Sequence, residues 1–369
     1  MKICILNHGL ASGGTDSFVL NLARGLTRDG HSVTIALAVN PGSGKQFRED
    51  EAREMGATVV KLSDLGSVQE VFRYVYRLYC FLRSGCFDVF HANMDLFNGI
   101  NMFVAWLARV PVRVCHSHNS LSQYEEKSKR HILVSIYRKI MRNMLWMFST
   151  DRCGCSEPAM DYLFLKRWKT DARSHLVYNG IDLNRFLTVD SVNRDVAGSV
   201  RSQKTIITVG RIEHQKNPYF TVSVMKELLA IDPRYKLIWV GTGDMRAEIV
   251  QEIQHLQLES AIQLLGTRTD IPELLHQAST FLFPSLFEGL PISLIEAQAA
   301  GLTCIVSDTI TRDIDIGLCE FMPLTLPPKQ WAERIIEFNN RCREVDNKKL
   351  QQFSIGSMVK RLEKIYEAH

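Results

Sequence analysis

Short apolar runs alternate with amphipathic stretches along the whole chain, and this alternation limits the possible folds more than any other feature. Alternating strands and helices form parallel sheets that helices cover on both faces. With 369 residues, the chain is long enough for two domains that each bury a core. The sequence therefore predicts two Rossmann-like, doubly wound domains of the α/β class. The predicted strands are 3–7, 32–39, 58–62, 88–92 and 112–116, and then 205–209, 236–240, 262–265, 281–283 and 303–307.

A polar segment marks the boundary between these two domains. Residues 188–202 contain Gly and Ser and show little hydrophobic periodicity, which is typical of a linker. We therefore place an N-terminal domain at 1–187 and a C-terminal domain at 188–355. An amphipathic stretch at about 356–369 follows and predicts a terminal helix.

Charge is distributed unevenly between the two predicted domains. The net charge of the chain is +4, but residues 1–185 carry 24 Lys and Arg against 17 Asp and Glu, a net charge of +7. The rest of the chain therefore has a net charge of −3. An excess of positive charge favours anionic partners, so we expect the N-terminal domain to face something anionic.

Composition also indicates the cellular setting. No run approaches the ~18 consecutive apolar residues of a membrane-spanning helix. The N-terminus enters a strand directly and lacks a signal-peptide layout. The nine cysteines are scattered, and Cys153 and Cys155 stand too close together for a zinc pair. We therefore expect a cytoplasmic protein whose cysteines are structural.

One strand–turn–helix stretch predicts an anion site. The apolar run 281–283 is typical of a buried strand, and Pro291 suits the first turn of the following helix, because the amide that proline lacks has no partner there. Gly301 suits the position just past the helix end, where left-handed backbone is favoured. The amides of residues 292–294 would then be free, and free amides at the positive end of a helix dipole bind anions.

Two glutamates bracket this predicted site. Glu288 lies in the turn, and Glu296 lies one to two turns into a helix with mostly apolar neighbours. A buried carboxylate is costly unless some group donates hydrogen bonds to it. Sugar hydroxyls can donate them, and so can an arginine elsewhere in the fold, since ion pairs often resemble functional sites. The stretch alone leaves both interpretations open.

The stretch from Phe287 to Gly301 resembles the F-E-G-x-P-x-x-x-x-E-A-x-A-x-G signature of the retaining GT-B glycosyltransferases of family 4. In that family the first glutamate contacts the donor sugar and the second contacts the ribose of its nucleotide. The resemblance thus implies a catalytic role for Glu288 and a ribose contact for Glu296. It also implies donor binding by the turn and the helix start, that is, by Gly289, Leu290, Pro291 and Ile292.

A basic loop follows the first strand of the second predicted domain. Taken alone, Arg211 and Lys216 are typical of solvated surface charges. A guanidinium can also bind two phosphate oxygens, and an ammonium adds a point charge. The loop resembles the G-R-x-x-x-x-K-N pattern of the same family, which implies that Arg211 and Lys216 act catalytically by contacting the donor diphosphate.

Three further turns resemble ligand-binding turns of the family. Gly13 and Gly14 follow the first strand, where glycines let the backbone approach a ligand. They do not form a dinucleotide fingerprint, but the resemblance implies contacts with the donor phosphates and the acceptor. The turns at Gly241 and Arg268 would line the nucleotide pocket, with Arg268 near the base.

Two histidines stand at the end of a predicted strand, on the edge where open α/β sheets bind ligands. A single histidine is usually structural, because imidazole pairs readily with backbone carbonyls. In the family a histidine at this point lies beside the donor sugar and the reacting bond. The resemblance implies that catalytic place for His118, which fits it better than His116.

Residues 127–148 carry six basic side chains and no acid, with apolar residues between them at the spacing of one helical face. This pattern is typical of a helix that packs on a sheet and exposes a basic side. It also suits a helix that rests on anionic lipid with its aromatic residues at the interface. Residues 73–83 have the same ambiguity. Family members often act on lipid-linked acceptors, which favours peripheral contact with the inner face of the cell membrane.

The resemblance covers nearly the whole chain and implies a GT-B fold, in which two domains face each other across a cleft and the helix at about 356–369 packs back onto the first. It implies retaining transfer of a sugar from a nucleoside diphosphate sugar, with UDP favoured over GDP, to a saccharide or lipid-linked acceptor in capsule or exopolysaccharide assembly. Arg211, Lys216 and the helix amides would compensate the diphosphate charge, so we expect no cofactor and no metal. Asp313 and Asp315 resemble a metal-binding D-x-D pair, but they lie downstream of the glutamate helix and not at a strand end that faces the donor, and a divalent site needs convergent oxygen ligands. We also expect no nucleic-acid partner.

Two alternatives are compatible with such a fold. A sugar-nucleotide epimerase or a phosphorylase can share it, and so can a catalytically silent sugar-nucleotide-binding protein, because fold does not determine function. The combination of the two motifs argues against all of these. Turnover of donor in the presence of a lipid-linked acceptor would separate them.

Overall fold

The computed structural model describes residues 1–11, 13–120, 132–187, 204–338 and 345–369. The chain forms two compact units. Unit 1 comprises Met1–Gly180 together with Phe353–His369, and unit 2 comprises Ile181–Gln352. The predicted linker and the basic residues at 127–131 lie outside the described residues.

Unit 1 is built on a parallel sheet of seven strands. They are β1 Lys2–Asn7, β2 Ser32–Leu37, β3 Thr58–Lys61, β4 Val89–Ala92, β5 Val112–Ser117, β6 Asp151–Gly154 and β7 Ser174–Leu176. Their order is β3-β2-β1-β4-β5-β6-β7, and the central β1 starts its pairing at Lys2↔Ser32 and Ile3↔Val89. The direction of winding reverses between β1 and β4, and open α/β sheets bind ligands beside such a reversal.

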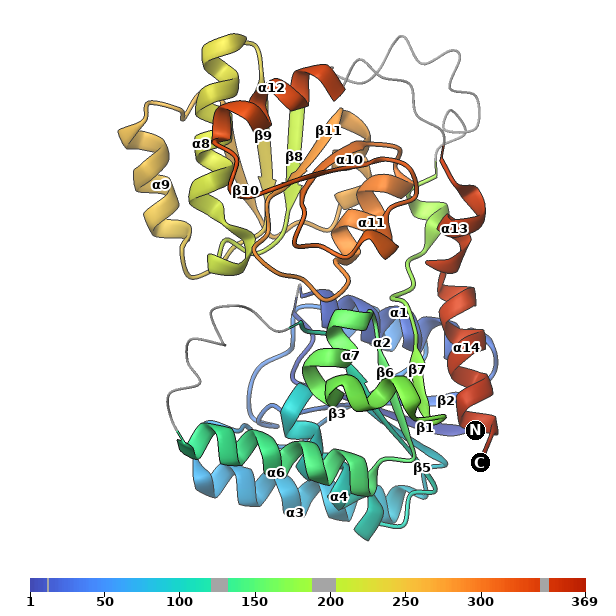
Figure 1. Ribbon diagram of the computed structural model, residues 1–369. Helices are drawn as coiled ribbons and strands as arrows, with labels where there is room; N and C mark the ends of the chain where they lie inside the picture. The colour runs from blue at the N-terminus through green and yellow to red at the C-terminus, as the bar shows by residue number, and fades with distance from the viewer. Residues whose placement is uncertain (12, 121–131, 188–203, 339–344) are drawn as a thin grey trace. The chain divides into compact units, whose positions relative to one another are not determined.

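Helices cover both faces of this sheet. They are α1 Gly14–Arg28, α2 Glu49–Glu54, α3 Val68–Gly85, α4 Asn98–Leu107, α6 Ile132–Phe148, α7 Glu157–Phe164 and α14 Ile355–Glu367. Figure 1 shows α3, α4 and α6 along one face, where they share a core with the strands through Tyr74, Met102 and Leu145. On the other face α14 lies beside α1.

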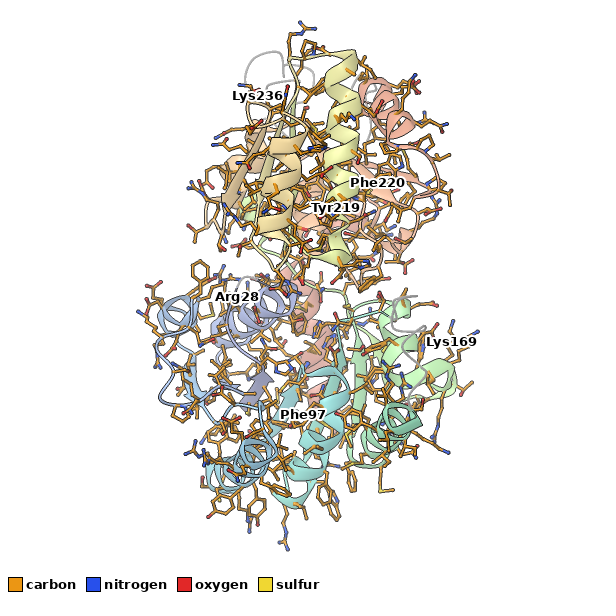
Figure 2. The ribbon with its side chains drawn as sticks, turned by 90° about the vertical axis from the view of Figure 1, so that its left-hand side faces the viewer. Arg28, Phe97, Lys169, Tyr219, Phe220 and Lys236 are labelled. Carbon is orange, nitrogen blue, oxygen red and sulfur yellow. The ribbon has the colours of Figure 1, made fainter. Side chains whose placement is uncertain are left out.

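Unit 2 is built on a parallel sheet of six strands. They are β8 Thr205–Val209, β9 Lys236–Val240, β10 Ile262–Gly266, β11 Thr280–Phe283, β12 Thr303–Ser307 and β13 Cys319–Met322, in the order β10-β9-β8-β11-β12-β13. The helices are α8 Pro218–Ile231, α9 Arg246–His255, α10 Ile271–Gln277, α11 Ile292–Ala299, α12 Pro328–Phe338 and α13 Asn347–Gln352. Phe220 of α8, which is labelled in Figure 2, packs edge-on against Trp331 of α12, with ring centroids 5.2 Å apart. The two parallel sheets confirm the predicted α/β class.

The strand ranges predicted above do not include β6, β7 or β13, and polar residues hide two of these three strands. In β6, Asp151 and Arg152 are buried, and each has an ionic partner: His175 lies 3.0 Å from Asp151, and Asp171 lies 2.9 Å from Arg152. In β13, Glu320 interrupts the apolar run. Local hydrophobicity cannot identify such strands, because the residues that pair with their polar side chains lie elsewhere in the sequence.

The terminal helix α14 packs against α1 at a glycine. A Cβ atom at Gly25 would lie 2.4 Å from Val359 Cγ2 and 2.9 Å from Ile355 Cγ2, so a larger residue would push the helices apart. The buried face of α14 comprises Ile355, Met358, Val359, Leu362, Ile365 and Tyr366. The chain therefore leaves unit 1 after Gly180 and returns to it from Phe353.

Candidate functional site

The carboxyl edge of the unit 2 sheet brings Lys216 and Glu288 together. Lys216 ends a short 3₁₀ helix, η7 (His214–Lys216), after β8, and Glu288 lies between β11 and α11. Lys216 Nζ is 2.5 Å from Glu288 Oε1, and the two side chains are 18% and 8% exposed. Burial of both charges is tolerable because each has the other as its partner. Glu288 therefore has an ionic partner of its own within unit 2, whereas the arginine pairing considered above concerned Glu296.

Neighbouring groups fix the geometry of this pair. Leu286 N donates to Gln215 O at 2.8 Å, and Gln215 Nε2 donates to Phe287 O at 3.0 Å. Lys216 Nζ also lies 4.5 Å from the centre of the Phe283 ring, a cation–π contact. The loops that follow β8 and β11 are therefore tied together, which holds the ammonium and the carboxylate at one place.

The two candidate arginines of unit 2 are exposed, and each forms an ion pair within its own loop. Arg211 Nε is 2.5 Å from Glu213 Oε1, and the arginine side chain is 60% exposed. Arg268 donates two hydrogen bonds to Asp270, at 2.8 and 2.6 Å, which lowers the pKa of the Asp270 carboxyl. An exposed pair contributes only about 0–1 kcal/mol, so the Arg268 guanidinium can turn to a ligand at little cost. Glu213 Oε1 is buried, so a move of Arg211 away from it would cost more.

Gly241 lets three strand ends meet. Its φ is +135°, and a Cβ there would lie 2.1 Å from Gly210 O. Gly241 N donates to Gly266 O at 2.8 Å, and Gly210 N donates to Val240 O at 2.9 Å. Packing alone therefore requires glycine at this position, whether or not a ligand approaches it.

The start of α11 differs from the prediction in two respects. Pro291 is the N-cap residue and Ile292 is the first helical residue, so the proline stands just outside the helix. The amide of Leu294 is not free, because it donates to Pro291 O at 3.1 Å in a tightened first turn. The amides of Ile292 and Ser293 precede the first bond of the helix, so the expected anion site reduces to these two donors.

The remaining turn residues are largely buried. Gly289 and Leu290 are buried, and Glu296 is half-buried on α11. Ser285, at the end of β11, is fully buried, and its Oγ has no hydrogen-bond partner among the described residues. A buried hydroxyl without a partner costs free energy, so Ser285 leaves an unused hydrogen-bonding group close to the Glu288 turn.

In unit 1, Asp16 holds the glycine loop that follows β1. Its carboxylate accepts hydrogen bonds from Gly13 N at 3.0 Å, Ala11 N at 3.1 Å and Asn7 Nδ2 at 2.8 Å. Burial raises the pKa of the Asp16 carboxyl. A Cβ at Gly14 would meet no atom within 4 Å in the described part of the chain, so packing does not require glycine there.

Three imidazoles cluster at the carboxyl edge of the unit 1 sheet. His91 belongs to β4, His116 to β5, and His118 follows β5. The rings of His116 and His118 are nearly parallel, with centroids 4.4 Å apart, and the centroids of His91 and His116 are 5.2 Å apart. Phe18 of α1 packs on His118 at 4.5 Å. Both histidines considered in the sequence thus lie in one cluster, with His91 as a third member.

Hydrogen bonds order these rings, and burial keeps them neutral. His91 Nδ1 lies 2.6 Å from Tyr366 Oη of α14, and His91 Nε2 lies 3.1 Å from His116 Nδ1. His118 Nε2 lies 2.8 Å from Asn93 Oδ1. Burial lowers the pKa of His91 and of His118 to about 3, and it lowers the pKa of His116 well below its usual range. All three imidazoles are therefore uncharged at neutral pH.

The candidate residues fall into two groups, one at the carboxyl edge of each sheet. Gly13, Gly14 and His118 lie in unit 1, and the others lie in unit 2. Asp16 and Asn93 were not identified from the sequence. An acidic residue in the first turn of a helix is a recognisable signal for Asp16. Asn93 carries no such signal, because its contact with His118 depends on the pairing of β4 with β5.

Two family models match the chain. The model described as Glycosyltransferase Family 4 matches residues 12–185, and the model described as Glycosyl transferases group 1 matches residues 190–312. EpsF from Bacillus subtilis, which is named as a glycosyltransferase, is 31% identical over 334 residues, which cover 89% of this chain and 85% of EpsF. CapH from Staphylococcus aureus, named as a capsular polysaccharide biosynthesis glycosyltransferase, is 26% identical over 337 residues, 88% of each chain.

A solved structure shares the fold. Alr3699/HepE from Anabaena, crystallised in complex with UDP-glucose, superposes with a TM-score of 0.77 at 16% sequence identity, and the match covers 100% of both chains. This similarity extends through both parallel sheets and the helices around them.

Proposed function

Because this chain belongs to glycosyltransferase family 4 of the GT-B fold, we propose that it transfers a sugar, with retention at the anomeric carbon, from a UDP-sugar to a saccharide or lipid-linked acceptor in polysaccharide assembly. The observation that carries the proposal is the Lys216–Glu288 pair beside the start of α11. The name of CapH supports capsule or exopolysaccharide assembly, and the UDP-glucose complex of the Anabaena protein supports UDP as the carrier.

In this proposal Lys216 and Arg211 bind the diphosphate. An ammonium has three N–H donors, so Lys216 can bind a phosphate oxygen while it keeps its contact with Glu288. The exposed guanidinium of Arg211 would turn from the half-buried Glu213 to the diphosphate, and the phosphate contact would have to offset the loss of that ion pair. Together with the amides of Ile292 and Ser293, these cations would stabilise the negative charge that develops on the leaving diphosphate. No divalent metal or cofactor is then needed, and full activity in excess EDTA would support that part.

The sugar and the nucleoside would bind on either side of the diphosphate. A carboxylate can accept several hydrogen bonds, so Glu288 can accept from sugar hydroxyls while it remains bound to Lys216. Glu296 would accept from the ribose hydroxyls, and Arg268 would release Asp270 to contact the base. In unit 1, His118 would contact the sugar, and the loop at Gly13 and Gly14 would approach the phosphates and the acceptor.

The transfer itself exchanges one bond at the anomeric carbon. The bond between that carbon and the diphosphate oxygen breaks towards an oxocarbenium-like state, and the acceptor oxygen bonds to the carbon on the same face. The acceptor proton leaves with the diphosphate. Charge compensation by Lys216 and Arg211 lowers the barrier, because they bind the separated diphosphate more strongly than the intact donor.

Calorimetric titration of UDP and GDP, without divalent metal, tests the donor assignment. We expect UDP to bind and the Glu296→Ala variant to lose at least ~10-fold in affinity, about 1.4 kcal/mol. Glu259→Ala, which removes an exposed carboxylate of unit 2, is the matched control. Preference for GDP would contradict the UDP assignment. Binding without turnover of any UDP-sugar, with saccharide and lipid-linked acceptors present, would favour the catalytically silent alternative.

We also propose that unit 1 contacts anionic membrane through a basic-aromatic face, defined as the exposed residues of α3 and α6. No helix within the described ranges has the length and hydropathy to cross a bilayer. Met141 and Leu145 bury the second half of α6, whereas Leu133 and Ile136 in its first half are 80% and 48% exposed. The corresponding exposed aromatics of α3 are Phe72 and Tyr76, and exposed basic residues accompany both helices at Arg73, Arg83 and Lys139.

Such a surface suits a lipid interface, because its apolar side chains enter the headgroup region while its cations attract anionic lipid. Sedimentation with vesicles of phosphatidylcholine and phosphatidylglycerol tests this. We expect binding that falls with salt and with the double variants Phe72→Ser/Tyr76→Ser and Leu133→Ser/Ile136→Ser. Tyr219→Ser, which removes an exposed aromatic of unit 2, should bind like the wild type. Equal binding to pure phosphatidylcholine would contradict the anionic-lipid assignment.

A further inference from the structure

Asn93 connects His118 to the central strand of unit 1. It follows β4 and is buried. Its backbone N and its side-chain Nδ2 both donate to Leu6 O of β1, at 3.0 and 3.1 Å. Its Oδ1 lies 2.8 Å from His118 Nε2. Asn93 thus spans from the backbone of one strand to the imidazole that follows another.

These contacts determine which nitrogen of His118 carries hydrogen. A backbone carbonyl can only accept, so the NH₂ group of Asn93 must face Leu6 O. The amide oxygen of Asn93 then faces His118, and an oxygen without hydrogen also only accepts. His118 Nε2 must therefore be the N–H donor. A neutral imidazole has a single N–H, so His118 Nδ1 carries the lone pair.

The Nδ1 atom of His118 is buried and has no hydrogen-bond partner among the described residues. Among the described residues, the rings packed on the imidazole are uncharged: the Phe18 ring from α1 and the stacked His116 ring from β5. The Cys155 thiol lies 3.7 Å from the backbone carbonyl oxygen of His118. Asp95, the carboxylate of the adjacent turn, is bound by Asn119. A buried acceptor without a donor is unfavourable, and a ligand that donates a hydrogen bond to it would remove that cost.

We propose that Asn93 is a positioning residue that fixes His118 as a neutral hydrogen-bond acceptor, so that the group His118 contacts in the substrate complex is a hydroxyl. A phosphate oxygen is excluded as its partner, because two acceptors repel each other. This inference rests on the proposed glycosyltransferase function for the identity of the hydroxyl. The two sets of residues then bind different groups: His118 accepts a hydrogen bond from a hydroxyl, and the cations of unit 2 bind the diphosphate.

Nitrogen-15 spectra of the histidine rings test the tautomer independently of activity, since they distinguish a protonated ring nitrogen from an unprotonated one. Comparison with the spectrum of the His118→Gln variant assigns the His118 signals. We expect protonated Nε2 and unprotonated Nδ1 in the wild type at pH 7, and a mixture of tautomers in Asn93→Ala. Asn101→Ala is the matched control, because Asn101 is also buried but bonds to Tyr74 Oη at 2.9 Å. Protonated Nδ1 in the wild type would overturn the inference.

Transfer kinetics test whether Asn93 acts through His118. We expect kcat/KM to fall ~10-fold or more in Asn93→Ala, that is, by about 1.4 kcal/mol or more, because one oriented hydrogen bond is lost. The double variant Asn93→Ala/His118→Gln should be no slower than His118→Gln alone, and additive losses would overturn the positioning role.

Asn93→Asp gives a second kinetic test. It would place a carboxylate beside Nε2 and raise the pKa of His118, so activity should fall as pH is lowered through that pKa while the wild-type profile stays flat. A flat profile with full activity in Asn93→Asp would contradict the acceptor role. If the spectra are as expected but the protein transfers no sugar, the proposed function is refuted and the tautomer assignment still holds.

Discussion

Glu288 and Lys216 each have two alternative partners, because each can bind either the other residue or a ligand. Glu288→Gln removes the negative charge and leaves the ammonium of Lys216 available to the diphosphate. We expect this variant to bind UDP as tightly as the wild type, or up to ~10-fold more tightly, and to lose transfer ~100-fold. Lys216→Met should instead weaken UDP binding ~10–100-fold. Calorimetry and initial rates check both, and equal weakening of UDP binding would show that the pair is only a structural support.

The buried histidines predict how stability depends on pH. The folded-state pKa of His91 is about 3, below the unfolded value near 6.5, so the unfolded chain binds more protons between these two values. The stabilisation is therefore fully present above pH 6.5 and is lost as pH falls towards 3. We expect the free energy of unfolding of unit 1, measured with urea, to decrease as the pH is lowered from 7 to 6 and to 5. His91→Gln should reduce that slope, whereas His255→Gln, at an exposed position of unit 2, should not.

A substitution at Gly14 distinguishes a role in ligand contact from a role in packing. A Cβ at this position meets nothing within 4 Å in the described residues, so Gly14→Ala should leave the melting temperature within about 2 °C of the wild type. If the loop approaches phosphates or acceptor, the added methyl group should still lower kcat/KM ~10-fold, because it keeps the ligand away from the backbone. Unchanged kinetics would remove Gly14 from the candidate site.

At the scale of elements, local chemistry predicts some features and misses others. The end of α11 was predictable: Gly301 has a φ of +79°, and Leu302 N donates to Ala297 O at 3.0 Å, which completes a helix-ending motif that needs a left-handed residue. The start of α11 was predicted only in part, because Leu294 turns back onto Pro291. The contacts of Lys216 and Asn93 were not predictable, because residues far apart in sequence supply their partners.

The strand ends of unit 2 depend on one backbone conformation. Gly241→Ala would introduce a Cβ 2.1 Å from Gly210 O at a φ that side chains rarely adopt. We expect a loss of at least about 1–3 kcal/mol in the stability of unit 2, because backbone strain and a steric clash add. Urea denaturation measures the loss, and hydrogen exchange should show the faster-exchanging amides in β9 and β10. Gly44→Ala, where a Cβ meets nothing within 4 Å, is the control.

At the scale of the whole molecule, the order of the chain differs from the order of the units. Unit 1 uses residues 1–180 and 353–369, so its folding requires a segment that follows all of unit 2 in sequence. The terminal helix contributes Tyr366, which lies 2.6 Å from His91 Nδ1, and Glu363, which lies 2.9 Å from His31 Nε2. The amphipathic spacing predicted this helix, but only the tertiary structure shows which side chains it brings to the histidine cluster.

The contact between Gly25 and Val359 predicts how strongly α14 supports unit 1. Gly25→Ala would place a methyl group 2.4 Å from Val359 Cγ2 and 2.9 Å from Ile355 Cγ2, so α14 must move away. We expect a loss of about 1–3 kcal/mol, faster hydrogen exchange in α1 and α14, and unchanged exchange in unit 2.

Val359→Ala removes the methyl groups that clash, so the double variant should lose less stability than the sum of the single variants. Gly356→Ala adds a methyl group to the same helix where nothing lies within 4 Å, and it should not destabilise the protein. Strict additivity of Gly25→Ala and Val359→Ala would show that this contact does not hold α14 on unit 1. Loss of protection in unit 2 as well would show that the two units unfold together.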